Sequence, residues 1–154
     1  FIGYTALTAL TKDIRRTYEY HGAEHKTIAC YEHGEELTVE NVKKYTRFHP
    51  RCGTSFIFLV LFISIFVNTI FRVSWANIWL RVVIKIALLP IVTGIAYELI
   101  RLAGRYDNIF TKIISAPGLW IQRITTSEPD GSQIECAIAA LKACIPENKE
   151  DDKW

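Results

Sequence analysis

The sequence lacks the patterns that identify several large classes of protein. No stripe of lysine and arginine interleaved with aromatic residues runs along the 154 residues, and the net charge is only +2, so we expect no binding to nucleic acid. No cleavable signal peptide and no internal repeat is recognisable. The composition is 50% hydrophobic and 22% charged, which does not fit a disordered chain.

The sequence also has no methionine and only four cysteines, Cys30, Cys52, Cys136 and Cys144. All four lie outside the long apolar stretches. On the topology predicted below they face a reducing compartment, so we expect no disulfide framework. The chain opens without an initiator methionine in the apolar stretch 1–11, which is too short to cross a bilayer. We expect this stretch to be the end of an upstream apolar helix.

Two apolar stretches in the middle of the chain are long enough to cross a membrane. Charge is absent from Ser55 to Phe71, and we predict a first span over residues 53–72, because about 20 apolar residues cross the hydrocarbon layer. A second span is predicted over residues 78–102, where basic side chains near the ends can extend to the interface. Pro90 and Gly94 predict a kink in it.

The expected fold class is therefore all-α. We predict an integral membrane protein with two complete transmembrane helices, the end of a possible preceding helix, and cytoplasmic or interfacial amphipathic helices, in a single membrane domain over residues 1–154. Polar segments at 12–52 and 106–154 flank the spans.

Basic residues near the ends of the spans predict the orientation. They precede the first span at Lys12, Arg15, Arg16, Lys43, Lys44, Arg47 and Arg51, and follow the second at Arg101, Arg105 and Lys112. The connection between the spans has only Arg72 and, at the start of the second span, Arg81. By the positive-inside rule, both polar segments are cytoplasmic and the loop at 73–77 is external. The expected location is a cell membrane, with membrane lipids as partners.

The polar segments predict further helices. One continues from the apolar stretch 1–11 through Asp13 to about Tyr31, and a short one follows Thr38, which can cap it. Residues 109–124 mix apolar and basic side chains, which is typical of an interfacial helix, broken at Pro117-Gly118. A last helix over 132–144 has an apolar face that we interpret as packing: Ile134, Ala137, Ile138, Leu141 and Ile145.

A histidine pair in the first polar segment suggests metal chemistry. His21-Gly22-Ala23-Glu24-His25 matches H-x-x-E-H, the reversed zincin signature. Histidines four apart on a helix project from one face and can bind one divalent ion, with zinc expected, while Glu24 is close enough to act as a general base on bound water. The alternative is that His21 and His25 are structural and hydrogen-bond to Tyr18 or Glu24.

A catalytic zinc needs a third protein ligand and an open position. The candidates are His49, Cys52 and Glu98. His49-Pro50-Arg51-Cys52 places imidazole and thiolate together just before the first span, and the positive end of that helix favours a thiolate at Cys52. Glu98 lies near one end of the second span, although pairing with Arg101 would explain it equally. His33, in a turn-like stretch, is interpreted as a solvated residue.

Several stretches resemble the YqhQ-type family of bacterial membrane proteins, which is named only as a domain of unknown function. They are Tyr20 to Lys26, His49 to Thr54, Gly94 to Ile100, Ala116 to Leu119 and Arg123 to Asp130. The likeness covers essentially the whole chain. It implies a membrane fold, additional N-terminal sequence in the family, and interest in His21, Glu24, His25, His49, Cys52 and Glu98, but it implies no substrate.

Two functions fit these patterns. The first is a metal-binding membrane protein, acting as a zinc-dependent hydrolase on a peptide or lipid-linked bond at the cytoplasmic membrane surface. The second is a non-enzymatic scaffold or transporter-like component, favoured by the proline, the glycine and the charges Lys85 and Glu98 in the second span. In either case the partner can be a second copy of the chain or another membrane protein.

Overall fold

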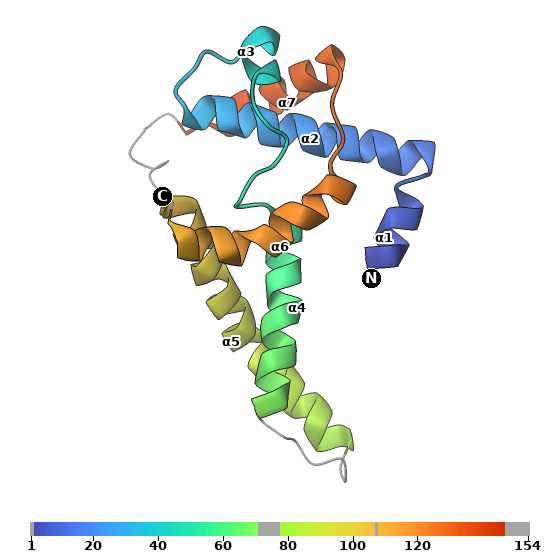
Figure 1. The fold of residues 1–154 in the computed structure, drawn as a ribbon, viewed down its shortest axis with the longest axis vertical. Coiled ribbons are helices and arrows are strands. Elements are labelled where there is room, and N and C mark those ends of the chain that lie inside the picture. Colours follow the sequence, from blue (N-terminus) through green and yellow to red (C-terminus); the bar gives the residue numbers. More distant parts are fainter. Residues whose placement is uncertain (1, 71–77, 107, 147–154) are drawn as a thin grey trace. The chain divides into compact units, whose positions relative to one another are not determined.

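The computed structural model describes residues 2–70, 78–106 and 108–146, and within these ranges all regular secondary structure is helical. The helices are α1 (Ile2–Thr8), α2 (Lys12–Glu32), α3 (Val39–Lys43), α4 (Gly53–Ile70), α5 (Ile78–Arg105), α6 (Ile109–Thr125) and α7 (Gly131–Cys144) (Figure 1). The all-α prediction is confirmed. Part of the predicted first span (71–72), the predicted external loop at 73–77 and residues 107 and 147–154 lie outside the described residues.

Contacts divide the chain into two compact units. Unit 1 comprises Phe1–His49 and Leu119–Trp154, and unit 2 comprises Pro50–Gly118. The expectation of a single membrane domain stays a prediction.

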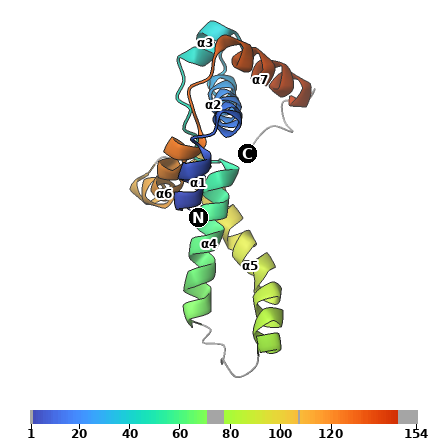
Figure 2. The same ribbon diagram turned by 90° about the vertical axis from the view of Figure 1, so that its right-hand side faces the viewer.

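The two helices of unit 2 match the predicted spans. α4 has 18 residues and α5 has 28, and both are long and apolar enough to cross a membrane. They lie side by side in both views of the chain (Figures 1 and 2). Among their described residues only Ser55, Val92 and Ala96 are buried. Side chains that are both apolar and exposed are what a helix in lipid presents.

Helix α5 continues through Pro90. The hydroxyl of Thr93 donates to the carbonyl oxygens of Leu89 at 2.8 Å and of Pro90 at 3.1 Å. Such bonds back to the preceding turn bend helices, and proline removes one backbone donor. The kink at this point stays a prediction.

The predicted continuous helix from the apolar stretch into α2 is wrong. α1 ends at Thr8 and α2 begins at Lys12, with Thr11 in an extended conformation at φ −79° and ψ 140°. The amide of Leu10 donates to the carbonyl of Leu7 at 3.2 Å, and the Thr11 hydroxyl donates to the carbonyl of Thr8 at 2.8 Å. These tight i to i−3 bonds close the last turn of α1 and end it.

The predicted break at Pro117-Gly118 is also wrong, because α6 runs through both residues. Glycine serves packing here. A β-carbon at Gly118 would overlap the side chain of Ser55 at the start of α4. The absence of a side chain at Gly118 therefore lets α6 and α4 approach closely within unit 2.

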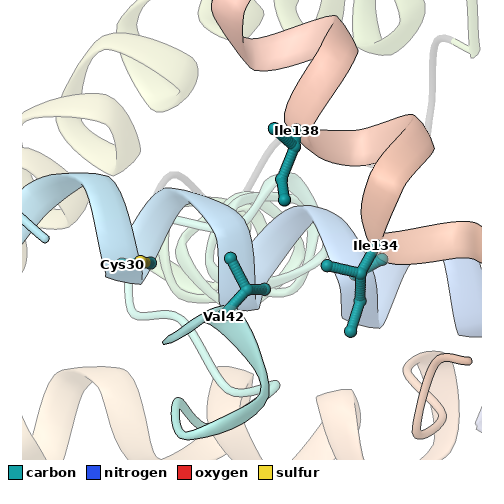
Figure 3. Packing of buried hydrophobic residues seen from close by; sticks show 5 residues of the cluster. Cys30, Val42, Ile134 and Ile138 are labelled. Atoms are coloured by element: carbon teal, nitrogen blue, oxygen red, sulfur yellow. The ribbon is translucent and has the colours of Figure 1, made fainter. Parts of the chain in front are cut away.

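In unit 1, α3 and α7 pack against α2 (Figure 2). Figure 3 shows side chains from all three helices meeting in one cluster: Ala23, Cys30, Val42, Ile134 and Ile138. The apolar face predicted for α7 supplies the last two. The Thr38 side chain accepts from the amide of Asn41, as predicted for the cap of α3. Burial raises the pKa of the Cys30 thiol, which therefore packs in its neutral form.

Candidate metal centre

Helix α2 brings His21 and His25 together on one face. Their ring centroids are 4.4 Å apart, and the rings meet edge to face at 63°. His25 is buried, with 3% of its surface exposed, and His21 is half-buried. The helical spacing thus places the two imidazoles one turn apart, as the H-x-x-E-H pattern predicts.

Each of these histidines is held through Nδ1 by a backbone carbonyl from a distant segment. His21 Nδ1 lies 2.9 Å from the carbonyl oxygen of Thr125, at the end of α6. His25 Nδ1 lies 2.6 Å from the carbonyl oxygen of Arg47, in the segment after α3. If the two histidines are structural, they bond to these two carbonyls, whereas the sequence suggests Tyr18 or Glu24 as partners.

These contacts determine the tautomer of both rings. A carbonyl oxygen has no proton to give, so Nδ1 must carry the hydrogen and donate it. In a neutral imidazole the lone pair is then on Nε2. Histidines that bind metals are commonly held in this way, with the other ring nitrogen donating to a carbonyl or carboxylate.

Close approach of the segment after α6 depends on Gly22. A β-carbon at this position would overlap the carbonyl oxygen of Ser127, and the amide of Ser127 donates to the carbonyl of Tyr18 at 2.9 Å. The glycine within H-x-x-E-H therefore lets residues 125–127 lie against α2. That contact brings the Thr125 carbonyl to His21.

His49 is the third histidine of the group. Its ring centroid lies 5.8 Å from that of His25. The side-chain amide of Gln122, which is fully buried, accepts from the His49 amide at 2.9 Å and donates to the His49 carbonyl at 2.8 Å. His49 Nε2 lies 3.3 Å from Glu32 Oε2. A carboxylate behind a histidine is the second common way in which metal-binding imidazoles are oriented.

The spacing within two ring pairs, His21–His25 and His25–His49, is near that expected for imidazoles on a shared ion. Two imidazoles on one tetrahedral zinc, at Zn–N distances of about 2.0–2.1 Å, have centroids roughly 5 Å apart. The observed separations, 4.4 Å and 5.8 Å, lie on either side of this value. Nitrogen donors from neutral imidazoles are also ligands that zinc prefers.

Glu24 is exposed. At 100° per residue it lies about 60° around the helix axis from His21, and therefore flanks the histidine face. His33 is exposed at the end of α2, where its Nδ1 lies 2.7 Å from the carbonyl oxygen of Ala29 in its own helix. This agrees with its interpretation as a solvated residue.

The other two candidate ligands, Cys52 and Glu98, belong to unit 2. Cys52 is buried just before α4, and its Sγ accepts from the amide of Thr54 at 3.4 Å. Glu98 is exposed on α5, with a carboxylate oxygen 3.7 Å from an Arg101 guanidinium nitrogen. The structure thus contains the Glu98–Arg101 pair that was the alternative explanation for this carboxylate.

A buried lysine beside the histidines was not singled out from the sequence. Lys26 is 4% exposed, forms an ion pair with Glu128 and donates to the carbonyl of Lys43 at 3.3 Å. It joins α2 to the segment before α7 and to the end of α3. Like the carbonyls of Arg47 and Thr125, it has no local sequence signal, because its partners lie far along the chain.

The fold and the site define a class: an all-α protein with two helices able to cross a membrane and a cluster of oriented histidines in its other unit. The chain belongs to the family described as "Protein of unknown function (DUF1385)", whose model matches residues 1–147. It is 43% identical over 145 residues to "Uncharacterized protein YqhQ" of Bacillus subtilis (strain 168), covering 94% of this chain. The chain spans 45% of the length of that relative. No solved structure matches the chain.

Proposed function

We propose that this chain is a metal-binding membrane protein in which Nε2 of His21 and of His25 hold a divalent cation, with zinc the expected ion. The observation that carries the proposal is the pair of Nδ1 contacts to the carbonyls of Arg47 and Thr125. Two separate segments orient two neighbouring rings in the same tautomer, and that arrangement favours one cation held by both.

His49 is one candidate for the third ligand. It lies in the same unit as the pair, beside His25, and Glu32 and Gln122 fix its orientation. Cys52 is a second candidate. It follows His49 by three residues, so the Cα atoms of the two lie at most about 11 Å apart. Glu98 stays a candidate, although its pairing with Arg101 makes it the third choice.

A site with three protein ligands leaves a position for water, which suits hydrolysis. Glu24 is the general base of this proposal, because it flanks the histidine face and reaches solvent. The expected reaction is the addition of water across a peptide or lipid-linked bond. We expect the bond that is hydrolysed to lie near a bilayer, because unit 2 carries the two apolar helices.

The proposal places α4 and α5 across the membrane and both polar segments in the cytoplasm. The distribution of lysine and arginine supports this orientation. Membrane lipids are then direct partners of the exposed apolar side chains on both helices. A second copy of the chain or another membrane protein is a further possible partner.

A non-enzymatic scaffold is the second candidate function. The observation that favours it is the number of buried polar groups in unit 1 that serve other segments, including Lys26, Gln122 and Gln133. In a scaffold the same histidines would only join α2 to the segments at 47 and 125. Metal content separates the two functions.

The test is metal analysis of the purified full chain in detergent by mass spectrometry. We expect close to one zinc per chain, and loss of it in His21→Ala and His25→Ala. His33→Ala is the matched control, since it removes an exposed histidine directly after the same helix. Metal-free protein, or equal zinc in all four proteins, would favour the scaffold.

Cobalt substitution distinguishes the third ligand. A cobalt–thiolate bond gives a charge-transfer absorption that imidazole does not, so Cys52→Ser abolishes this band only if Cys52 is a ligand. Loss of cobalt affinity in His49→Ala with no such band in the parent would identify His49. For the reaction itself, Glu24→Gln should retain the metal and lose hydrolysis.

A further inference from the structure

A cavity of about 440 Å³ lies within unit 1, beside the candidate metal centre. Side chains from α1, α2, the segment before Pro50 and the end of α6 border it. Three of them are arginines, Arg15, Arg47 and Arg123, which come from sequence positions far apart. The fold thus brings three arginines to the border of one small volume. The guanidinium carbon of Arg47 lies 5.1 Å from the centroid of the Phe48 ring.

The carboxylates at this cavity already have partners. Glu19 lies 3.7 Å from Arg15 and accepts from the side-chain amide of Gln133 at 2.9 Å, and Glu128 is paired with the buried Lys26. Arg47 and Arg123, in contrast, have no carboxylate partner among the residues that the structure describes. The cavity therefore has an excess of positive charge that its own walls do not neutralise.

The cavity is lined in part by the two segments whose carbonyls hold His21 and His25. Arg47 borders it, and the carbonyl of the same residue holds His25. Ile124 also borders it, and the next residue, Thr125, holds His21. A molecule bound here would contact the two backbone segments that orient the proposed metal ligands.

We propose that this cavity binds the phosphate group of a ligand, with Arg47 and Arg123 as its main donors. Guanidinium groups match phosphate oxygens in charge and in bidentate geometry. Ala6 and Ala9 border the same cavity, and α1 exposes Ile2, Tyr4 and Leu7 to solvent. We expect an apolar chain attached to the phosphate to extend along α1, so a phospholipid headgroup fits better than free phosphate. That this ligand is the substrate rests on the proposed metal function; the binding site itself does not.

The test is calorimetric titration of the full chain in a zwitterionic detergent with three probes: inorganic phosphate, dihexanoyl phosphatidic acid and dihexanoyl phosphatidylcholine. The Arg47→Gln/Arg123→Gln variant removes two charges and keeps the backbone carbonyls of Arg47 and Thr125 that hold the histidines. Arg16→Gln/Lys142→Gln is the matched control, because it removes two charges from unit 1 at residues that do not border the cavity. We expect the dissociation constant for phosphatidic acid to rise about tenfold to a hundredfold in the first variant and less than threefold in the control.

Equal binding of phosphatidic acid and inorganic phosphate would support a phosphate site without a role for the apolar chain. Tighter binding of phosphatidic acid would support the lipid headgroup. Binding of phosphatidylcholine as tight as that of phosphatidic acid, or the same weakening in both variants, would overturn the proposal, as would no binding of any probe. Zinc content is measured in parallel: if His25→Ala loses zinc but keeps phosphatidic acid binding, both sites stand separately, and if the parent holds no zinc, only the metal proposal fails.

Discussion

The two units of this chain bury different kinds of side chain. In unit 2, α4 buries only Ser55, and α5 buries only Val92 and Ala96, while large apolar side chains lie exposed along both helices. In unit 1, buried polar residues stand beside the apolar cluster, and several of them bond to segments distant in sequence. The length of the apolar stretches therefore describes unit 2 well, whereas long-range polar contacts define unit 1.

The difference has a physical cause. A helix in lipid satisfies its backbone internally and needs few side-chain contacts, so α4 and α5 can expose apolar residues on most sides. A small polar unit has little apolar surface to bury, and each polar group that it buries needs a partner. Substitutions in unit 1 should accordingly cost more than equivalent substitutions in unit 2.

The largest expected difference is between two isoleucines. Ile134, on α7, is fully buried in the cluster of unit 1, whereas Ile65, on α4, is 60% exposed. Ile134→Ala should destabilise unit 1 by about 2–5 kcal/mol, because it leaves a cavity among packed side chains. Ile65→Ala should change stability by less than about 1 kcal/mol.

Thiol labelling measures this effect inside unit 1. Cys30 belongs to the same cluster and is fully buried, so its labelling, located by mass spectrometry, reports opening of the core. Ile134→Ala should increase the Cys30 labelling rate at least tenfold, and Ile65→Ala should leave it unchanged. Equal rates in both variants would mean that the two units do not differ in packing as described.

Two helical glycines give the next comparison. Gly22→Ala should destabilise unit 1 by about 1–3 kcal/mol, because the added methyl group would overlap the carbonyl of Ser127. Gly94→Ala in α5 meets nothing within 4 Å, and alanine is the better helix former, so we expect no loss. Thermal unfolding in detergent measures both. A destabilised Gly94→Ala would indicate a contact on α5 that the chain alone does not provide.

The sequence predicts those parts of the fold that depend on local pattern. The two apolar helices, the Thr38 cap and the apolar face of α7 all follow from the spacing of residues. The break at Thr11 did not, because hydroxyl groups returning to carbonyls end α1 without any proline or glycine. Gly118 was interpreted as a helix breaker, although its role is close packing against Ser55.

The candidate site was predictable only in part. The H-x-x-E-H spacing predicts that His21 and His25 share a face, and they do. What holds them is invisible in the sequence, since every residue has a carbonyl and nothing marks those of Arg47 and Thr125. In the sequence, Arg15 and Arg47 are signals of topology and Arg123 is a basic residue of an interfacial helix. Nothing local predicts that they converge, because this depends on how α1, α2 and the end of α6 pack.

A smaller effect is expected at Gln122, where one substitution removes both hydrogen bonds between its side-chain amide and the backbone of His49. Gln122→Leu keeps the approximate size of the side chain but leaves the amide and carbonyl of His49 without this partner. We expect a loss of about 1–2 kcal/mol in thermal unfolding, since buried groups left unsatisfied carry this cost. Under the metal proposal, zinc affinity should also fall, and the Gln122→Glu variant should restore neither value.

The smallest expected effect is at the N-terminus of α7, where it can be isolated by pH. Asp130 caps this helix; the amide of Gln133 and the hydroxyl of Ser132 donate to its carboxylate, and chiefly the first of these lowers its pKa. A carboxyl group with a lowered pKa in the folded state stabilises that state above its ordinary pKa of about 4, and this contribution is lost as the pH falls through the lowered value. Asp130→Asn keeps an acceptor for the cap but cannot titrate. The melting temperature of the parent should therefore exceed that of Asp130→Asn slightly at neutral pH, with the difference disappearing as the pH falls through the lowered pKa of Asp130. A constant difference across this range would mean that the charge of Asp130 contributes nothing to the stability of α7.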